Sequence, residues 1–287
     1  MERALVVSTA CRPPQEDGRE LVRWTIRDVA AQIVREGWIE TIHYSTVCAI
    51  LQEAELRPHR TRYWQWSQDP DFERKAASVL WYYERASSLA RDGVLVVCID
   101  EKTGIQAIGR KTPDILPAPG IKRLREFEYV RHGVANLSLA LVVPTGQVHG
   151  RVVESNNSDN FIESLERIVH ANRDAKRIEL VLDNGSSHVS KQTAAWFEEN
   201  RDRVRPHFTP THASWLDQAE LALSAFSRRY LRNAVFNSRD ELVTRIERGL
   251  VEYNALYAHP FAWSFSRHAM HDWYQRRICP ATCPTRP

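Results

Sequence analysis

The sequence predicts an α/β protein in which a mixed β-sheet is flanked by helices, preceded by an all-α segment at the N-terminus. Two runs, 94–99 and 178–182, are apolar at nearly every position, with Glu179 the one exception, which is typical of central strands buried on both faces. Segments with the apolar spacing of helices lie between and after these runs. The first 66 residues show helical spacing alone, which indicates a separate helical part.

The N-terminal zone contains two short helical patterns close together. The first has its apolar residues on one helical face and should end near Gly37, with the face formed by Ile26, Val29, Ala30, Ile33 and Val34. The second begins near His43 or Tyr44. Two such helices joined by a tight turn form either a helix-turn-helix, whose second helix lies in the major groove of DNA, or a plain helical hairpin. The spacing alone leaves both open.

Three arginines and three aromatic residues lie close together directly after the second helix, from Arg57 to Trp66. Arginines placed in this way can pair with DNA phosphates while their stems pack on the helices. A packed connector that follows Pro58 would have the same composition. If the zone binds DNA, its predicted contacts are Tyr44, Ser45, Thr46, Arg57, Arg60 and Arg62.

The central zone begins with a predicted helix over 71–90, followed by the apolar run 94–99, which ends at Asp100. Strands are predicted over 133–143 and 147–154, joined by a turn at 144–146. A helix follows from about Ser158.

The second apolar run ends at Asp183. After it we predict a helix around 191–200, a short strand around 204–208 and a long helix from Ser214 to about Arg232. Three strands followed by helix, strand, helix, strand and helix form the order of a ribonuclease-H-like fold. Beyond Ser238 the chain is predicted to be helical and then to end in an aromatic tail. The predicted parts are an all-α domain 1–68, a linker helix 69–92, a ribonuclease-H-like domain 93–260 and a tail 261–287.

Composition narrows the class of protein. Hydrophobic residues make up 43% and charged residues 26% of the 287 positions, as in ordinary globular proteins. The longest apolar stretches are far shorter than a membrane span, and no secretory signal is visible, so we expect a cytoplasmic protein without a membrane partner. The odd number of cysteines, five, indicates reduced thiols.

The net charge of +3 barely favours a nucleic-acid partner. Residues 109–131, however, include six basic and three acidic residues. Such an excess is typical of a solvated loop and, less often, of phosphate contact. The residues that would make such contacts are Arg110, Lys111, Lys122 and Arg123.

Three carboxylates carry the functional hypothesis. Asp100 and Asp183 each follow a predicted buried strand, and ligand sites of open sheets gather at strand ends, although aspartate is also common in turns. Two adjacent carboxylates repel each other and need a cation, and their hard oxygens favour Mg²⁺ or Mn²⁺. Asp217 and Glu220, three positions apart, are expected on one face of the last long helix. Alone, they would be ordinary first-turn acids.

Four strings resemble the insertion sequence 630 family of bacterial transposases, a mariner-like branch of the DDE superfamily. They are Cys98–Gln106, Glu126–Gly133, Leu180–Asn184 and His207–Leu216. The resemblance covers about residues 20 to 265. It implies a ribonuclease-H-like catalytic core, a metal-binding triad at Asp100, Asp183 and Glu220, and helix-turn-helix DNA binding at the N-terminus.

The resemblance also implies a reaction. With Asp100 bridging two Mg²⁺ or Mn²⁺ ions, the site would cut double-stranded DNA at transposon ends and join the 3′-hydroxyls to target DNA. The partners would be terminal inverted repeats and target DNA. Because two ends must meet, a homodimer is expected by analogy, associated with the nucleoid when bound.

Two departures from the family pattern stand out. The family usually has asparagine where Asp217 stands, so an extra carboxylate could perturb metal binding or provide another ligand. Members usually carry a further helix-turn-helix module upstream, and Met1–Cys11 resembles its tail. A truncated product is therefore expected, in which the chemistry survives while sequence-specific binding of the ends suffers.

Other residues near the triad are candidates for accessory roles. His188 could contact phosphate or orient a water, or be an ordinary packing histidine, and Asn184 directly follows Asp183. Glu101 and Lys102 could reach DNA.

Three alternatives stay open: a DNA-binding remnant that no longer cuts, a ribonuclease-H-like nuclease that cuts without joining, and a zinc protein. The ligands of the zinc protein would be His268, His271, Cys279 and Cys283.

Overall fold

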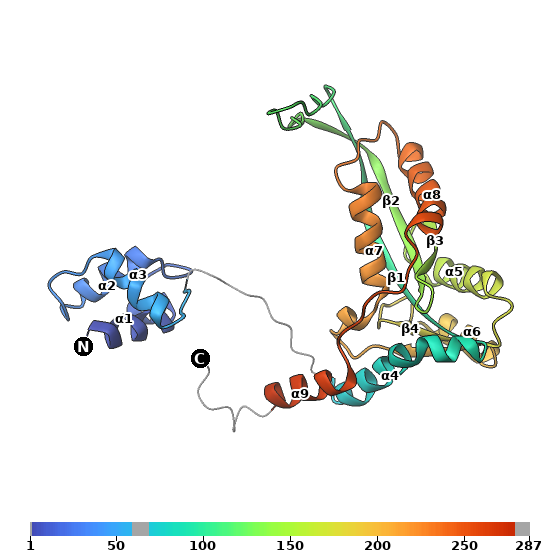
Figure 1. The fold of residues 1–287 in the computed structure, drawn as a ribbon, viewed down its shortest axis with the longest axis horizontal. Coiled ribbons are helices and arrows are strands. Elements are labelled where there is room, and N and C mark those ends of the chain that lie inside the picture. Colours follow the sequence, from blue (N-terminus) through green and yellow to red (C-terminus); the bar gives the residue numbers. More distant parts are fainter. Residues whose placement is uncertain (1, 59–68, 279–287) are drawn as a thin grey trace. The chain divides into compact units, whose positions relative to one another are not determined.

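The computed structural model describes residues 2–58 and 69–278, and the chain divides into two compact units, Met1–Gln65 and Trp66–Pro287 (Figure 1). No helix in these two ranges is long and apolar enough to cross a membrane.

The N-terminal unit is a bundle of helices α1 (Glu2–Cys11), α2 (Ile26–Arg35) and α3 (Tyr44–Glu53), with a short 3₁₀ turn η1 (Pro14–Asp17). All three α-helices contribute to one core, which contains Val6, Trp24, Val29, Ile33, Val47 and Leu51. Helix α2 begins with a reciprocal capping box between Thr25 and Asp28. Helices α2 and α3 therefore occur where the apolar spacing predicted them.

Two features of this unit differ from expectation. The α2–α3 connection covers residues 36–43, with Gly37 in the left-handed region at φ 72°, and is longer than the tight turn we predicted. The segment that resembles the tail of an upstream module forms α1 instead, and its Val6 is completely buried in the core of this unit. The packing of α1 makes it part of this bundle.

The second unit contains a five-stranded sheet of order β3-β2-β1-β4-β5 (Figure 1). Its strands are β1 (Val94–Arg110), β2 (Tyr129–Val142), β3 (Gln147–Val153), β4 (Arg177–Leu182) and β5 (Val204–Phe208). The first three pair antiparallel, whereas β4 pairs parallel with both β1 and β5. This is the mixed sheet that the sequence predicted.

Strand β1 is much longer than the predicted run. It continues past Ile99 to Arg110 because β2 keeps pairing with it, across register shifts on either side of Ile105, after β4 has ended (Figure 1). Asp100 therefore lies inside a strand, paired with Leu139, and not at a strand end as predicted. It still lies at an edge of the parallel part of the sheet, because β4 ends at Leu182.

Helices cover both faces of the sheet. One face packs against α4 (Phe72–Arg91), α7 (Ala219–Phe226), α8 (Arg239–Leu256) and α9 (Arg267–Ile278), and the other against α5 (Ser158–Ala171) and α6 (Lys191–Glu199). Alternation along β1 divides its side chains between them, with Val96 and Cys98 on the α4 face and Val97 and Ile99 on the α5 face.

Helices α4 and α9 differ from the predicted linker and tail. Helix α4 buries Phe72, Val79 and Tyr83 in the core of the second unit, so it is part of that unit. Helix α9 lies within the segment predicted as a tail and packs on α4, where Trp273 and Tyr274 contact the ring of Phe72 at centroid distances of 5.5 and 5.2 Å. Aromatic packing thus orders a segment whose sequence shows little helical amphipathicity.

The predicted helix from Ser214 to Arg232 is broken into three pieces. A 3₁₀ turn η2 (Ser214–Leu216) precedes α7, and a π-helical turn η3 (Ser227–Leu231) follows it. Asp217, at φ −79° and ψ 116°, is extended and separates η2 from α7. Ser214 therefore does not cap the α-helix.

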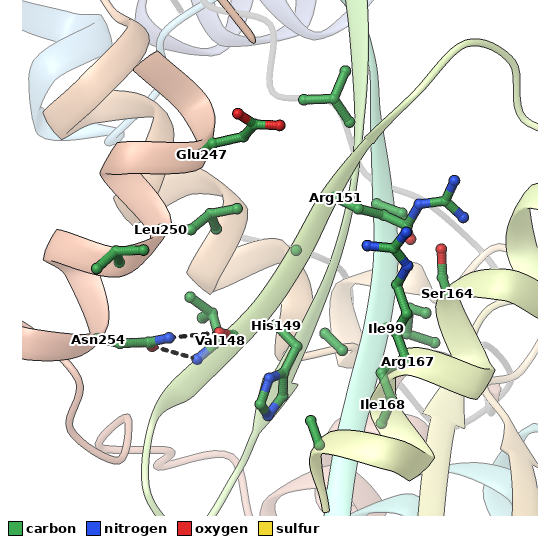
Figure 2. Close-up of a pocket in the computed structure, with 16 residues that line it drawn as sticks. Ile99, Val148, His149, Arg151, Ser164, Arg167, Ile168, Glu247, Leu250 and Asn254 are labelled. Atoms are coloured by element: carbon green, nitrogen blue, oxygen red, sulfur yellow. Dashed lines mark hydrogen bonds between the residues drawn. The ribbon is translucent and has the colours of Figure 1, made fainter. Parts of the chain in front are cut away.

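The outer strand β3 is held by a side chain of α8. Asn254 accepts a hydrogen bond from the Val148 amide and donates one to the Val148 carbonyl, both at 2.8 Å (Figure 2). The amide thus substitutes for a neighbouring strand at this position. A cavity of about 600 Å³ lies beside it, lined by residues of β3, α5 and α8, with Arg151 and Arg167 on one side and Glu247 and Leu250 on the other (Figure 2).

A charged cluster is buried under α4. Glu179 of β4, 1% exposed, accepts hydrogen bonds from Arg177 at 2.6 Å and from His207 at 2.7 Å. Burial raises the pKa of Glu179, but the bonds from His207 and Arg177 outweigh it, so the net pKa lies below its usual value.

We expect Glu179→Gln to lower the free energy of unfolding at neutral pH by about 1–3 kcal/mol, because it removes a charge from two charge-assisted bonds. Because the pKa of Glu179 is lower in the folded protein than its ordinary value near 4.5, its ionised carboxylate stabilises the fold fully only above that ordinary value. The stabilisation is lost as the pH falls through the pKa of Glu179 in the folded protein. Urea denaturation at pH 7 and pH 4 would measure this. A difference between wild type and variant that is equally large at both pH values would contradict it.

Candidate active site

The parallel pairing of β1 with β4 brings the two aspartates together. Cys98 pairs with Val181, so Asp100 and Asp183 each lie two positions beyond that pair. Cys98 and Val181 face the same layer of helices, and alternation continues this face to Asp100 and towards Asp183. Helix α7 packs over this face, and Glu220 is its second residue. Three elements distant in sequence thus converge on one site.

The carboxylates interact electrostatically. Burial, and then the negative charges of Glu101, Asp183 and Glu220, raise the pKa of Asp100 to about 6, against the lowering effect of a hydrogen bond from the Glu101 amide. That amide donates to Asp100 Oδ1 at 2.7 Å. The site thus holds more negative charge than its own donors balance, which favours a cation.

His188 joins two of the acidic side chains. Its Nδ1 lies 2.7 Å from Asp183 Oδ1, and its Nε2 lies 3.0 Å from Glu101 Oε2. The imidazole is 1% exposed and packs 4.2 Å from the ring of Phe161. Burial lowers the pKa of His188, but the bonds to Asp183 and Glu101 prevail and raise it to about 10, so the ring is charged at neutral pH.

This geometry revises the roles expected for His188 and Glu101. A buried ring with both nitrogens engaged does not reach a phosphate, so His188 orients Asp183 instead. The bond from His188, opposed by burial, lowers the pKa of Asp183. Glu101 points at His188 and not at solvent, and its Oε1 is buried without a partner in the described part of the chain.

Asn184 connects two loops beside the site, whereas Lys102 lies at its margin. The Asn184 amide donates to the Thr209 carbonyl at 2.7 Å, which ties the loop after β4 to the loop after β5. Lys102 is exposed and lies at the margin of the carboxylates.

Asp217 is a buried acid beside the triad. It is 1% exposed, its Oδ1 accepts a bond from the Ala219 amide at 2.8 Å, and its Oδ2 has no partner among the described residues. Burial, together with the charges of Asp100, Asp183 and Glu220, raises the pKa of Asp217 well above its usual value. Asp217 precedes α7, so it does not share a helical face with Glu220 as we had predicted.

A groove of about 620 Å³ runs along α7 and β1 beside the triad. Asp100, Glu101 and Glu220 line one part of it, and Lys102, Arg228 and Arg232 line another. Sequence reasoning missed the two arginines, although they follow Glu220 by eight and twelve positions on the segment predicted to be helical. A search for basic residues on the helical face of Glu220 would have found Arg228.

The donor set fits a divalent metal in its chemistry. The side chains offer hard carboxylate oxygens, the local charge is negative, and two buried carboxylate oxygens, on Glu101 and Asp217, lack partners within residues 2–58 and 69–278. In the same ranges, no three histidine, cysteine, aspartate or glutamate side chains are grouped closely enough to hold a metal ion.

The zinc alternative gains no support from the described residues. His271 is hydrogen-bonded to Glu73, and His268 lies 3.6 Å from Asp272. Cys279 and Cys283 lie outside the described residues.

The predicted DNA contacts of the N-terminal unit are exposed where described. Tyr44, Ser45 and Thr46 form the exposed first turn of α3, and Arg57 is exposed beyond its end. The Arg27 guanidinium lies over the Tyr44 ring at 5.3 Å. Arg60 and Arg62 lie outside the described residues.

The basic residues between β1 and β2 are largely neutralised by their own segment. Arg123 and Arg125 pair with Asp114 at 2.7 and 2.8 Å, and Lys111 pairs with Glu128. Arg110 donates to the carbonyls of residues 126 and 127, whereas Lys122 is exposed. The acids that make these pairs are already counted in the local balance, so the net excess is unchanged, but three of the six basic residues are engaged within the segment.

Comparison with known proteins agrees with this geometry. The family model described as DDE superfamily endonuclease matches residues 95–243. An "Insertion element IS630 uncharacterized 39 kDa protein" of Shigella sonnei is 31% identical over 110 residues, which are 38% of this chain and 32% of that protein. The aligned region thus spans about a third of that relative's length.

Two solved structures of Mos1 transposase share the fold. The paired-end complex with the left transposon end has a TM-score of 0.59 at 17% identity and covers 96% of this chain and 77% of that chain. The mariner Mos1 paired-end complex with Mg has a TM-score of 0.56 at 17% identity, covering 98% and 78%. The fold is therefore ribonuclease-H-like, as predicted. The matched family model covers Asp100, Asp183 and Glu220, and the chain belongs to the DDE superfamily endonucleases, in agreement with its resemblance to the insertion sequence 630 branch.

Proposed function

We propose that the chain is a DNA transposase that cuts DNA at the ends of an insertion element and joins the freed ends to target DNA. The observation that carries this proposal is the convergence of Asp100, Asp183 and Glu220 from β1, β4 and α7 beside one groove. The family match and the fold of the Mos1 complexes, one of which contains a transposon end, support it.

Asp100, Asp183 and Glu220 would hold two Mg²⁺ or Mn²⁺ ions. Bound metal would supply Lewis-acid stabilisation of the attacking and leaving oxygens in phosphoryl transfer. His188 holds the Asp183 carboxylate in one orientation through a 2.7 Å bond, and Glu101 holds His188 in turn. Burial of the His188 and Glu101 side chains shields their contact from water.

The N-terminal unit is proposed to bind terminal inverted repeats through the exposed first turn of α3, as a helix-turn-helix does. A homodimer is proposed because two transposon ends must be brought together for joining.

Replacing one triad member at a time, in Asp100→Asn, Asp183→Asn and Glu220→Gln, should reduce cleavage at least about 100-fold, because each removes a charge that holds metal at the reacting phosphate. The assay is metal-dependent cleavage and strand transfer on a labelled duplex that carries the element's ends, with Mg²⁺ or Mn²⁺. Asp202→Asn, at an exposed carboxylate outside the groove, serves as control. Wild-type cleavage in any triad variant would overturn the assignment.

Removing His188 should destabilise the protein as well as slow cleavage. In His188→Leu the largely buried Glu101 carboxylate loses its partner, and we expect unfolding to become easier by about 3 kcal/mol. The double variant Glu101→Gln/His188→Leu should recover part of that stability without recovering cleavage, since Asp183 is still unoriented. Thermal denaturation and the cleavage assay together measure this. Equal stability of the single and double variants would show that the Glu101–His188 contact is unimportant.

Asp217→Asn should leave cleavage within about threefold of wild type, because an amide oxygen can accept the same bond from Ala219 and the buried site favours a neutral side chain. The cleavage assay and the apparent affinity for Mn²⁺ are the readouts. A drop in both comparable to that of Glu220→Gln would mean that Asp217 is itself a metal ligand.

A further inference from the structure

The groove beside the triad is lined by one continuous stripe of the α7–η3 segment. The lining positions on this segment are Glu220, Leu223, Ser224, Ser227, Arg228 and Leu231, and Arg232 lines the groove directly after the segment ends. Their spacing of three and four residues is that of a single helical face. An acidic end at Glu220 and a basic end at Arg228 and Arg232 thus belong to the same wall.

The π-helical turn extends this face. In a regular α-helix, a residue twelve positions after Glu220 would be rotated about 120° away from it. The turn η3 instead closes with a bond of 2.7 Å from the Arg232 amide to the Ser227 carbonyl, five positions back, and such a wider turn reduces the rotation per residue. Arg232 consequently lines the same groove as Glu220.

The two groove arginines keep their charge available. Arg228 donates to the Ser224 hydroxyl at 2.6 Å, a neutral partner one turn nearer to Glu220. Over residues 2–58 and 69–278, neither Arg228 nor Arg232 forms an ion pair with a carboxylate, in contrast to Arg123 and Arg125. Both are exposed.

Arg229 provides the contrast within the same turn. Its guanidinium lies 4.0 Å from the centroid of the Tyr257 ring, a cation–π contact, and Arg229 does not line the groove. Adjacent arginines of one turn therefore differ in orientation, and only those on the face of Glu220 reach the groove.

We propose that Arg228 and Arg232 bind backbone phosphates of the DNA strand that is cut, on one side of the scissile phosphate. The inference rests on the proposed function and adds the substrate contacts of that site. Arg228 and Arg232 lie roughly 12 and 18 Å along the helix axis from Glu220, at 1.5 Å per residue. The proposal places α7 along the duplex axis, where a strand advances 3.4 Å per nucleotide, so the contacted phosphates are about three to five nucleotides from the cut. Guanidinium groups suit phosphate because they can donate two parallel hydrogen bonds.

The first test measures three groove variants, Arg228→Gln, Arg232→Gln and the double variant of these two. The control is Arg229→Gln, which removes one positive charge from the same turn but outside the groove. Affinity for duplex DNA carrying the element's ends is measured over a range of salt concentrations. Each groove variant should bind roughly three- to tenfold more weakly, and the double variant should lower the salt slope by about two. Arg229→Gln should keep the wild-type slope. Equal slopes in all four variants would overturn the proposal.

The second test locates the contacts. Duplexes carry one neutral methylphosphonate at each of the first eight positions on either side of the cut. Wild type should lose affinity at one or two positions, about three to five nucleotides from the cut on one side, and the double variant should lose nothing further there. A position-by-position pattern that is the same in both proteins would reject the assignment.

Cleavage is followed in parallel to separate this inference from the proposed function. If wild type cuts in the presence of metal but the methylphosphonate patterns coincide, the function stands and the arginine contacts are wrong. If wild type binds with the expected pattern and never cuts, the contacts stand and the catalytic proposal fails.

Discussion

The site depends on the parallel pairing of β1 with β4. Because Cys98 pairs with Val181, the chain places Asp100 and Asp183 at the same height although more than eighty residues separate them. A shift of one residue in this register would turn one aspartate towards the opposite helical layer. Close packing on both faces opposes such a shift, because each helical layer is packed against the particular side chains that now face it.

Burying several carboxylates beside the β1–β4 pairing costs free energy, and the structure reduces this cost in two ways. His188 is held as a cation between Asp183 and Glu101, so two acids share one buried positive charge. Asp217 is buried completely enough to favour its neutral form, which removes a further charge from the cluster. The charge that remains, on Asp100 and Glu220, lies along the groove, where a cation or a substrate can approach.

The same segment that supplies Glu220 also shapes the groove beyond it. An extended residue, Asp217, separates α7 from the preceding turn, and a π-helical turn widens its end. Both interruptions depart from regular helix, and interruptions of the latter kind are frequent at functional sites. In this chain they set the start of the helical face at Glu220 and keep Arg232 on that face.

The sequence by itself determined the fold class, the strands β4 and β5 and the helices α2 and α3, and its resemblance to the insertion sequence 630 family pointed to the triad candidates. Apolar periodicity is a local property, and it is set by which side chains must be buried. Only the tertiary structure decided that β1 runs on to Arg110, that α9 packs on α4, that His188 is buried between two acids, and that Asp217 lies before the helix. These features depend on partners distant in the sequence: β2 extends β1, Phe72 orders α9, and Glu101 meets His188 across 87 positions. Local spacing carries no information about which distant segment supplies the partner.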